Sequence, residues 1–246
     1  MSSPATEEIE LETEEADANR DSLSERIYAR LRIDLMSGRY EPGSRLNIRG
    51  LAAAYDMSPT PVREAIVQLV REGALELRLG HQPRVPVLTI PQYINIRETR
   101  APLERLAAEL GAVHITEGDI ETLKALHDRF VQSEIEERWK EALAANQEFH
   151  FTIYRASGND VLVRCIENLW LLAGPFVNNQ YPLVRETHSV HPHLLIIDAL
   201  TRRAPGETGE LVVRDLREGS YVILEKIKND AGEGRSKRTR RKKAEA

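Results

Sequence analysis

Four polar residues in the second half of the chain fall on helix faces that are otherwise apolar. Asn146 and His150 lie four residues apart and therefore project from the same face of one expected helix. His193 and Asp215 occupy apolar faces of two later helices. A buried polar group without a partner costs roughly 1–3 kcal/mol, so we expect the four side chains to satisfy one another or to share an ion. The apolar residues on these faces are Trp139, Leu143 and Ile153, then Ile196, Ile197 and Leu200, then Leu211, Val212 and Val222.

Two imidazoles, a carboxylate and an amide oxygen have the chemistry of a site for a divalent metal ion. Imidazole prefers transition metals, so this set favours zinc, nickel or manganese over calcium. The other interpretation is a metal-free polar network in which Asp215 pairs with a protonated histidine. We expect His188 and His191 to be loop residues, although either could replace Asn146 as a ligand.

A second constellation lies in residues 58–73, whose sequence is SPTPVREAIVQLVREG. A serine N-cap, a proline at the first helical position and a terminal glycine predict a short helix. One face is apolar and must be buried, while Thr60 and Arg63 project side by side from the opposite face. Such a helix suits insertion into a DNA major groove, although the pattern alone is also that of an ordinary amphipathic surface helix.

The elements around that helix predict a winged helix-turn-helix domain over residues 22–88. A first helix ends at Gly38, and a second helix follows Asn47, whose side chain can cap it. Beyond residue 73, two short strands are expected over residues 74–79 and 84–88, joined by a Gly-His-Gln-Pro turn.

The remainder predicts an all-α antiparallel bundle over residues 89–230, so the fold class is mainly α. Capping boxes, glycines and prolines divide this part into helices. We expect them near residues 92–114, 117–135, 138–157, 160–180, 187–203 and 208–230. Outside the two domains, residues 1–21 have the composition of a disordered acidic tail, and residues 231–246 that of a flexible basic tail.

Composition and charge narrow the classes of protein to which the chain can belong. The single Cys165 excludes an internal disulfide framework, and no apolar run reaches the length of a membrane span. The acidic, polar start has no signal-peptide pattern, so we expect a cytoplasmic protein. The net charge is −5, yet residues 22–88 carry ten basic and seven acidic side chains. The charge signal for nucleic-acid binding is therefore local, and the net charge of the whole chain hides it.

Several motifs follow one another without a gap through most of residues 22–88. They are PG-S-x-L at 42–46, LA at 51–52, SPTPVREAI at 58–66, L-x-x-E-G-A-L at 69–75 and a glycine-tipped wing. Together they resemble the GntR family of bacterial transcription regulators. The family has an arginine where this chain has Pro59. Losing a base contact of that kind lowers the discrimination between the correct and a wrong base by about 1–3 kcal/mol. The resemblance implies DNA contacts from Arg49, Ser58, Thr60, Arg63 and the wing glycine Gly80.

A helical bundle behind such a domain resembles the FadR-type subfamily, whose C-terminal domain senses a ligand and dimerises. Many members bind a divalent metal ion through an Asp-x-x-x-His pair and two further histidines. Here Asn146 takes the position of the aspartate, and His150 matches its partner. His193 matches the third ligand, and Asp215 takes the position of the final histidine. The resemblance therefore implies a metal site in which the carboxylate has moved from the first ligand to the last.

The same resemblance gives Arg100 a role. Subfamily members often carry an arginine at this position that can pair with an acidic effector, as guanidinium geometry allows. Arg100 flanks the apolar stripe of the first bundle helix. The other interpretation is an ion pair at the rim of the domain with Glu98 or Glu104.

These observations favour a homodimeric, effector-responsive transcription regulator that binds a pseudo-palindromic double-stranded DNA operator, with an organic acid as the expected effector. A second class is a metal-dependent hydrolase with a DNA-targeting module, because His127-Asp128 resembles the dipeptide of metal-dependent phosphohydrolases. Adjacent helix residues cannot both enter one core site, so we expect no enzyme. A third class is an effector-free architectural DNA-binding protein, which the basic tail favours and the inward polar residues disfavour.

Overall fold

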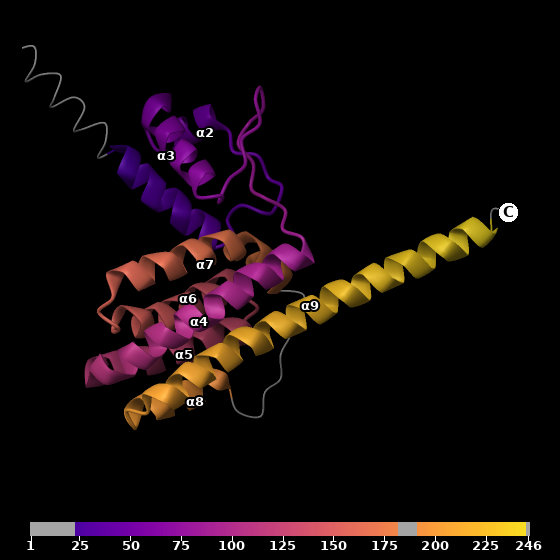
Figure 1. Ribbon diagram of the computed structural model, residues 1–246. Coiled ribbons are helices and arrows are strands. Elements are labelled where there is room, and N and C mark those ends of the chain that lie inside the picture. The colour runs from indigo at the N-terminus through magenta and orange to yellow at the C-terminus, as the bar shows by residue number, and fades with distance from the viewer. Residues whose placement is uncertain (1–22, 182–190, 245–246) are drawn as a thin grey trace, which may run out of the picture. The chain divides into compact units, whose positions relative to one another are not determined.

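The computed structural model describes residues 23–181 and 191–244, with side chains up to residue 225 apart from that of Val222. The chain divides into two compact units, Met1–Val87 and Leu88–Ala246 (Figure 1). This division falls beside the domain boundary that we expect at residue 88. The acidic tail expected over residues 1–21 lies outside the described residues.

Helices of the first unit bury one apolar side each. A helix over residues 23–36 is followed by α2 (Ile48–Ala54) and α3 (Pro59–Arg71). Asp34 at the end of the first helix accepts hydrogen bonds from Arg39 Nη1 at 3.0 Å and from Tyr55 Oη at 3.2 Å. The apolar stripe predicted for α3 is buried, as an amphipathic helix requires. The buried apolar side chains are Ile27, Leu31, Leu35, Ala52, Val62, Ala65, Ile66 and Leu69.

The wing after α3 is a hairpin held by isolated β-bridges. The two strands that we predicted over residues 74–79 and 84–88 are therefore too long. Glu76 and Arg84 exchange backbone hydrogen bonds of 2.7 and 2.8 Å, and Arg84 also bridges to Arg45. Pro83 and Pro86 have no N–H to donate, so they limit an antiparallel ladder at this point. No longer strand occurs in residues 23–181 or 191–244.

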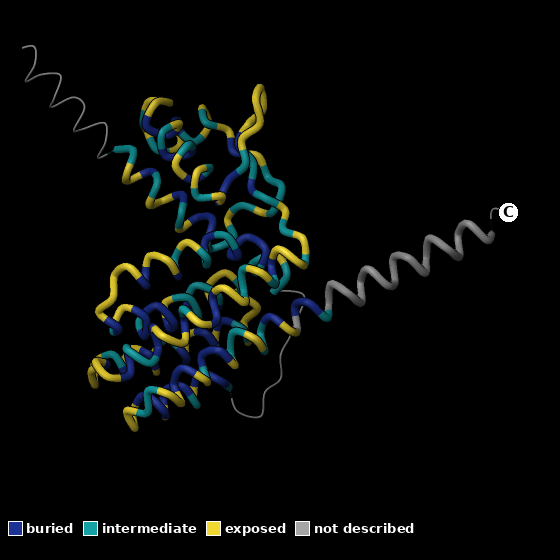
Figure 2. The backbone as a smooth tube through the Cα atoms, in the orientation of Figure 1, coloured by how far each residue is buried: buried dark blue, intermediate teal, exposed yellow. Residues whose placement is uncertain are grey.

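Six helices of the second unit pack side by side (Figure 1). α4 lies against α9, α7 and α6, while α5 lies against α6 and α8, and α8 against α9. Figure 2 shows the buried residues along the sides of these helices that face one another. The mainly α fold, with a winged helix-turn-helix before a helical bundle, is confirmed. The helices are α4 (Ile90–His114), α5 (Glu117–Ile135), α6 (Trp139–Arg155), α7 (Asp160–Gln180), α8 (Pro192–Thr201) and α9 (Pro205–Ala244).

Local sequence signals explain where the bundle helices begin. Thr89 caps α4 in a capping box with Gln92, so α4 starts two residues before the predicted position. Thr116 and Asp119 form the predicted capping box of α5, with hydrogen bonds of 2.9 and 3.1 Å. α8 starts at Pro192, directly after its N-cap residue, whereas the start predicted at residue 187 lies outside the described residues.

The last helix is longer than the sequence predicts. α9 continues to Ala244, past the end expected at residue 230 and through the expected basic tail. Lysine, arginine and alanine are strong helix formers, and they make up most of residues 234–244. The flexibility of this tail stays a prediction.

α4 and α6 approach each other closely at Gly111. A Cβ atom added to Gly111 would lie 2.3 Å from the backbone oxygen of Ile153 on α6. Only glycine allows this approach without displacement of the backbone. The contact fixes α6, which carries Asn146 and His150, against α4, which carries Arg100.

Candidate functional site

α3 presents three of the residues to which the resemblance assigns DNA contacts. Ser58, Thr60 and Arg63 are exposed, while the apolar side of α3 is buried. Ser58 occupies the N-cap position, but its side chain makes no capping hydrogen bond. Arg63 forms no ion pair with the described residues. These side chains are therefore open to phosphates and base edges from outside the molecule.

Arg49 and Gly80 extend the exposed set to α2 and the wing. Asn47 Oδ1 accepts hydrogen bonds from the backbone N–H groups of Arg49 at 3.1 Å and Gly50 at 3.2 Å, which fixes the start of α2. The Arg49 side chain itself is exposed. Gly80 lies at the wing tip with a φ of +76°, a conformation that favours glycine, and its neighbour Leu79 is fully exposed.

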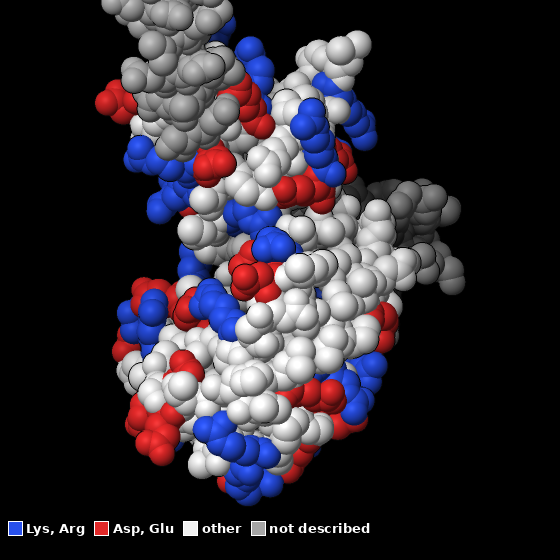
Figure 3. Space-filling model, turned by 60° about the vertical axis from the view of Figure 1, so that its left-hand side comes forward, with Lys and Arg blue, Asp and Glu red and all other residues white. Residues whose placement is uncertain are grey.

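Charged side chains of both signs are visible on each of the two units in Figure 3. Lysine and arginine side chains lie among aspartate and glutamate side chains on both units. In this view the first unit therefore shows no uniformly basic surface.

α6, α8 and α9 bring together the four inward polar residues Asn146, His150, His193 and Asp215, which we call the polar cluster. His150 Nε2 lies 2.9 Å from Asp215 Oδ2, and His193 Nε2 lies 3.0 Å from Asn146 Oδ1. The ring centroids of the two histidines are 5.4 Å apart. The ligand atoms of His150, His193 and Asp215 lie within 4.8 Å of one another. Helical spacing in the sequence thus located side chains that do meet in the fold.

The surroundings of the polar cluster set the charges of its members. His193 is fully buried and stacks on Phe149 with 3.8 Å between ring centroids. Burial lowers the pKa of His193 well below its ordinary value, although the charge of Asp215 acts in the opposite direction. Burial would raise the pKa of Asp215, but its hydrogen bond and charge interaction with His150 lower that pKa to about 2. A neutral imidazole and an ionised carboxylate are the forms that bind metal ions.

Arg100 lies inside the bundle, paired with Glu104. Arg100 Nε donates to Glu104 Oε1 at 2.6 Å, and both side chains are buried. The alternative of an ion pair with Glu104 is therefore right about the partner and wrong about the rim. The guanidinium lies over the ring of Trp170, 4.3 Å from its centroid. Among the described residues, Nε is the only atom of this side chain that makes a hydrogen bond, so two guanidinium nitrogens are left for a ligand.

Glu104 joins Arg100 to the polar cluster through residues that sequence reasoning missed. Its carboxylate also accepts hydrogen bonds from Tyr154 Oη at 2.8 Å and Trp170 Nε1 at 2.7 Å. The rings of Tyr154 and Trp170 lie 6.0 and 5.9 Å from the ring of His150. Burial and the charge of Glu104 raise the pKa of Tyr154 well above its ordinary value, so its hydroxyl stays a donor. Tyr154 follows His150 by one helical turn, a spacing that could have indicated it.

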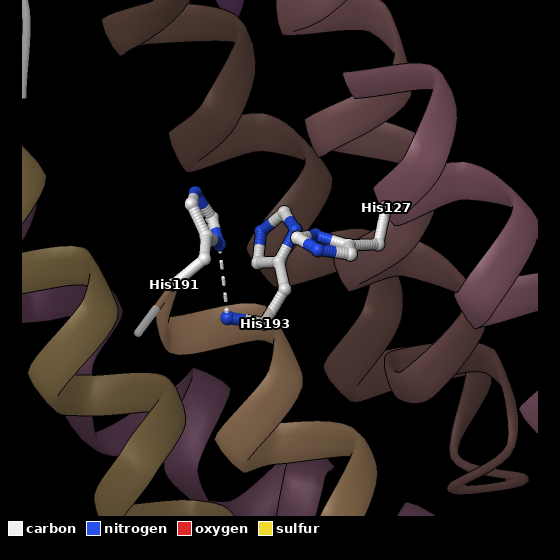
Figure 4. A group of neighbouring side chains, drawn as sticks. All are labelled: His127, His191 and His193. Atoms are coloured by element: carbon white, nitrogen blue, oxygen red, sulfur yellow. Dashed lines mark hydrogen bonds between the residues drawn. The ribbon is translucent and has the colours of Figure 1, made fainter. Parts of the chain in front are cut away.

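His191, which could replace Asn146 as a ligand, and His127, which was not expected as a ligand, both lie beside His193. Figure 4 shows the rings of His127, His191 and His193 close to one another. His191 is the N-cap of α8, where its Nδ1 accepts a hydrogen bond from the backbone N–H of His193 at 3.2 Å. His127 is buried and Asp128 is exposed, as expected, so the dipeptide does not enter one site. We call His127, His191 and His193 the histidine cluster.

Comparison with known proteins identifies the family. The profile described as "Bacterial regulatory proteins, gntR family" matches residues 23–83, which hold α2, α3 and most of the wing. The profile of the FCD domain matches residues 95–218, half of the chain, including the polar cluster. The chain belongs to the GntR family. It carries an FCD domain behind its GntR domain, as the resemblance to the FadR-type subfamily predicts. Among the described residues, no helix is both long and apolar enough to cross a membrane.

Several relatives of this GntR-family chain are named as transcriptional regulators. The HTH-type transcriptional regulator McbR of Escherichia coli K12 is 31% identical over 179 residues, which are 71% of this chain and 81% of McbR. The Nta operon transcriptional regulator of Aminobacter aminovorans is 28% identical over 202 residues, which are 78% of this chain and 90% of that protein. The solved structure of E. coli McbR/YncC matches with a TM-score of 0.78 at 25% identity, covering 83% of this chain and 98% of that one. A GntR regulator from Rhodococcus sp. RHA1 shares the fold, with a TM-score of 0.65 at 22% identity, over 83% of this chain and 98% of that one.

Proposed function

We propose that this GntR-family protein is a transcription regulator whose binding to an operator is controlled by a small carboxylic acid. The acid binds inside the FCD domain, between Arg100 and the polar cluster. The observation that carries the proposal is the convergence of polar side chains from α4, α6, α8 and α9 within an otherwise apolar bundle. A bundle that served only as a scaffold would not need these groups, since burying them costs free energy.

DNA binding belongs to the first unit in this proposal. In a homodimer, two copies of α3 enter successive major grooves of a pseudo-palindromic operator. Thr60 and Arg63 face the base edges, and Ser58 and Arg49 fix the register by contacts to the backbone. Gly80 lets the wing backbone approach the DNA closely, because it carries no side chain.

The polar cluster holds a divalent metal ion in this proposal. Its donor set of two imidazole nitrogens, a carboxylate oxygen and an amide oxygen fits zinc, nickel or manganese. The ligand atoms of three members already lie within 4.8 Å of one another, so small rotations of the side chains bring them to one ion. A bound ion supplies a Lewis-acidic position for one oxygen of the effector carboxylate.

Arg100 supplies the second contact to the effector. Its Nε is engaged with Glu104, and Trp170 covers one face of the guanidinium. The remaining nitrogens can donate to a carboxylate with the paired geometry that arginine favours. An acid that binds there changes the affinity for DNA only if it binds the two states of the dimer with different free energies.

Metal content and thermal stability test the sensing part of the proposal. Tag-free protein is analysed for bound metal and then heated with zinc, nickel or manganese and a panel of carboxylic acids. We expect bound metal and a rise in Tm with at least one acid. Arg100→Lys keeps the charge beside Glu104 but loses the fork of the guanidinium, so it should keep the metal and lose the response to the acid. Absence of both metal and a stabilising acid would leave the metal-free polar network as the correct interpretation.

DNA binding is tested by a substitution on α3. Duplexes are selected from a random pool with the wild-type protein, and their affinity is measured by fluorescence anisotropy. Arg63→Ala should abolish retention of the selected DNA without a change in Tm, because Arg63 is exposed and has no partner among the described residues. Arg164→Ala, an equal change of charge at an exposed position of α7, is the control. Equal binding by Arg63→Ala and wild type would refute the assignment of α3.

A further inference from the structure

The histidine cluster brings three imidazoles from two helices to one place (Figure 4). His127 comes from α5, while His191 and His193 come from the start of α8. The ring centroids are 4.5 Å apart for His191 and His193, 5.1 Å for His127 and His191, and 5.7 Å for His127 and His193. One ligand nitrogen from each ring lies within 4.8 Å of the other two.

Two of these imidazoles are buried with an unpartnered nitrogen. His127 is 7% exposed, and its side chain makes no hydrogen bond with the described residues. Nδ1 of His127 and Nδ1 of His193 are both shielded from solvent without a partner. A buried polar atom left unpaired costs about 1–3 kcal/mol, which a phenylalanine in either place would avoid. Packing alone therefore does not account for histidine at these positions.

We propose that His127, His191 and His193 form a second metal site, which binds a divalent transition metal ion through three imidazoles. The site shares His193 with the polar cluster, and it can be tested without measuring the control of DNA binding. An all-imidazole donor set favours copper, nickel and zinc, whereas carboxylate and amide oxygens also suit manganese. The two sites therefore differ in the metals that they select.

Packing around the three rings suits a metal site. Zn–N bonds of about 2.0–2.1 Å require the nitrogens to approach one another further, so metal binding needs rotation of the His127 ring and of the half-buried His191 ring. Phe130 lies 5.1 Å from the ring of His191 and 5.3 Å from that of His193, and Phe149 stacks on His193. These aromatic rings exclude water from the side of the cluster on which His193 lies. Three protein ligands leave a further coordination position for water or a small anion.

The two sites are alternatives for one ion at a time. His193 Nε2 lies 3.0 Å from Asn146 Oδ1, so this ring belongs to both groups. Two dications bound to the two ring nitrogens of one buried imidazole would repel each other strongly. The metal present would therefore decide which of the two sites is filled.

Copper and manganese serve as the two probes in the test. Tag-free, chelator-treated full-length protein is titrated with CuSO₄ and with MnCl₂, and the copper complex is examined by electron paramagnetic resonance for coupled imidazole nitrogens. The key variant combines His127→Phe, which removes no hydrogen bond of the described structure, with His191→Asn, which keeps a side chain that can cap α8. His114→Phe removes an exposed histidine at the end of α4 and is the matched control.

We expect three coupled imidazole nitrogens for copper in wild type and in His114→Phe. The double variant should lose at least one coupled nitrogen and roughly tenfold or more in copper affinity, with manganese affinity unchanged. Asp215→Asn should weaken manganese and leave copper as in wild type. The proposal is overturned if the double variant keeps the copper affinity and spectrum of wild type, or if Asp215→Asn removes the copper signal. If binding of zinc, nickel and manganese does not depend on Asp215 and no carboxylic acid raises Tm, the proposed function fails while this site still stands.

Discussion

At the scale of single residues, the buried carboxylate of Glu104 organises the expected effector site. It accepts hydrogen bonds from Arg100, Tyr154 and Trp170, which come from α4, α6 and α7. A buried carboxylate is stable only when charge and hydrogen bonds compensate its loss of hydration. Glu104 therefore both neutralises Arg100 and fixes the direction in which the free guanidinium nitrogens point.

Glu104→Gln should destabilise the protein strongly. The variant leaves the guanidinium of Arg100 buried without a counter-charge. The NH₂ group of the new glutamine also cannot accept the hydrogen bonds that a carboxylate oxygen of Glu104 accepts. We expect a loss of about 3–5 kcal/mol in the free energy of unfolding, measured with urea. Glu98→Gln on the same helix removes an exposed charge, for which the loss should be about 1 kcal/mol or less. Similar losses in the two variants would show that Glu104 is not a buried counter-charge.

Tyr55 should make the stability of the first unit sensitive to alkali. Burial and then the charge of Asp34 raise the pKa of Tyr55 to about 12. An unfolded tyrosine ionises near pH 10, so between about pH 10 and 12 the unfolded state loses a proton that the folded state keeps. Stability from this group is therefore complete below pH 10 and falls as the pH rises. In thermal scans, the Tm of Tyr55→Phe should fall less between about pH 10 and 12 than the Tm of wild type. Identical dependence of Tm on pH in the two proteins would contradict this role of Tyr55.

The sequence predicted the polar cluster because its members repeat at helical spacing among apolar residues. Asn146 and His150 needed only the geometry of one helix to be placed on one face. The sequence did not identify Trp170 as a partner of Glu104, because that contact depends on how α7 packs against α4. The contact between His191 and His127 could not be predicted either, because it depends on how α5 and α8 pack together.

At the scale of elements, local signals located most helices and failed where longer-range effects decide. The Thr116 and Asp119 capping box marked α5 correctly, and the apolar stripe of α3 is buried as predicted. The wing strands were overestimated because alternating apolar residues favoured them while Pro83 and Pro86 removed hydrogen-bond donors. The end of α9 was placed too early because the basic end of the chain was interpreted as a flexible tail.

Gly111→Ala should loosen the contact between α4 and α6. The new methyl group would lie 2.3 Å from the Ile153 oxygen, so backbone must move and the variant should lose about 1–3 kcal/mol. Gly219→Ala in α9 is the matched control, because a Cβ atom there meets nothing within 4 Å. The free energy of unfolding of Gly219→Ala should rise by about 0.5–1 kcal/mol, because alanine has the higher helix propensity. Urea unfolding of both variants measures the difference, which would vanish if α4 and α6 could separate freely.

At the scale of the whole molecule, the chain combines two units to which we assign separate tasks in our proposal. Leu88 and Ile90 already pack against the bundle core around Tyr93 and Phe176, so the second unit begins with its own apolar contacts. The residues expected to bind DNA all lie before this point, and those expected to bind the metal and the effector all lie after it. Communication between the tasks must therefore pass from one unit to the other.

Residues 88–246 should fold alone and keep the ligand chemistry. Every contact that we describe for the polar cluster is made within the second unit. We expect one cooperative thermal transition for this fragment and affinities for metal and acid close to those of the full chain. Calorimetry of both proteins makes the comparison. A fragment that is folded but has lost the metal would place part of the site in the first unit.

An acid bound in the FCD domain should change the affinity of the protein for DNA. The most direct measurement is the Kd of the full-length protein for its selected operator, with and without an acid that raises Tm, in the presence of zinc. We predict a change in Kd of about 5–150-fold in wild type and none in Arg100→Lys. The same Kd with and without the acid, at a concentration that saturates the thermal shift, would contradict the account.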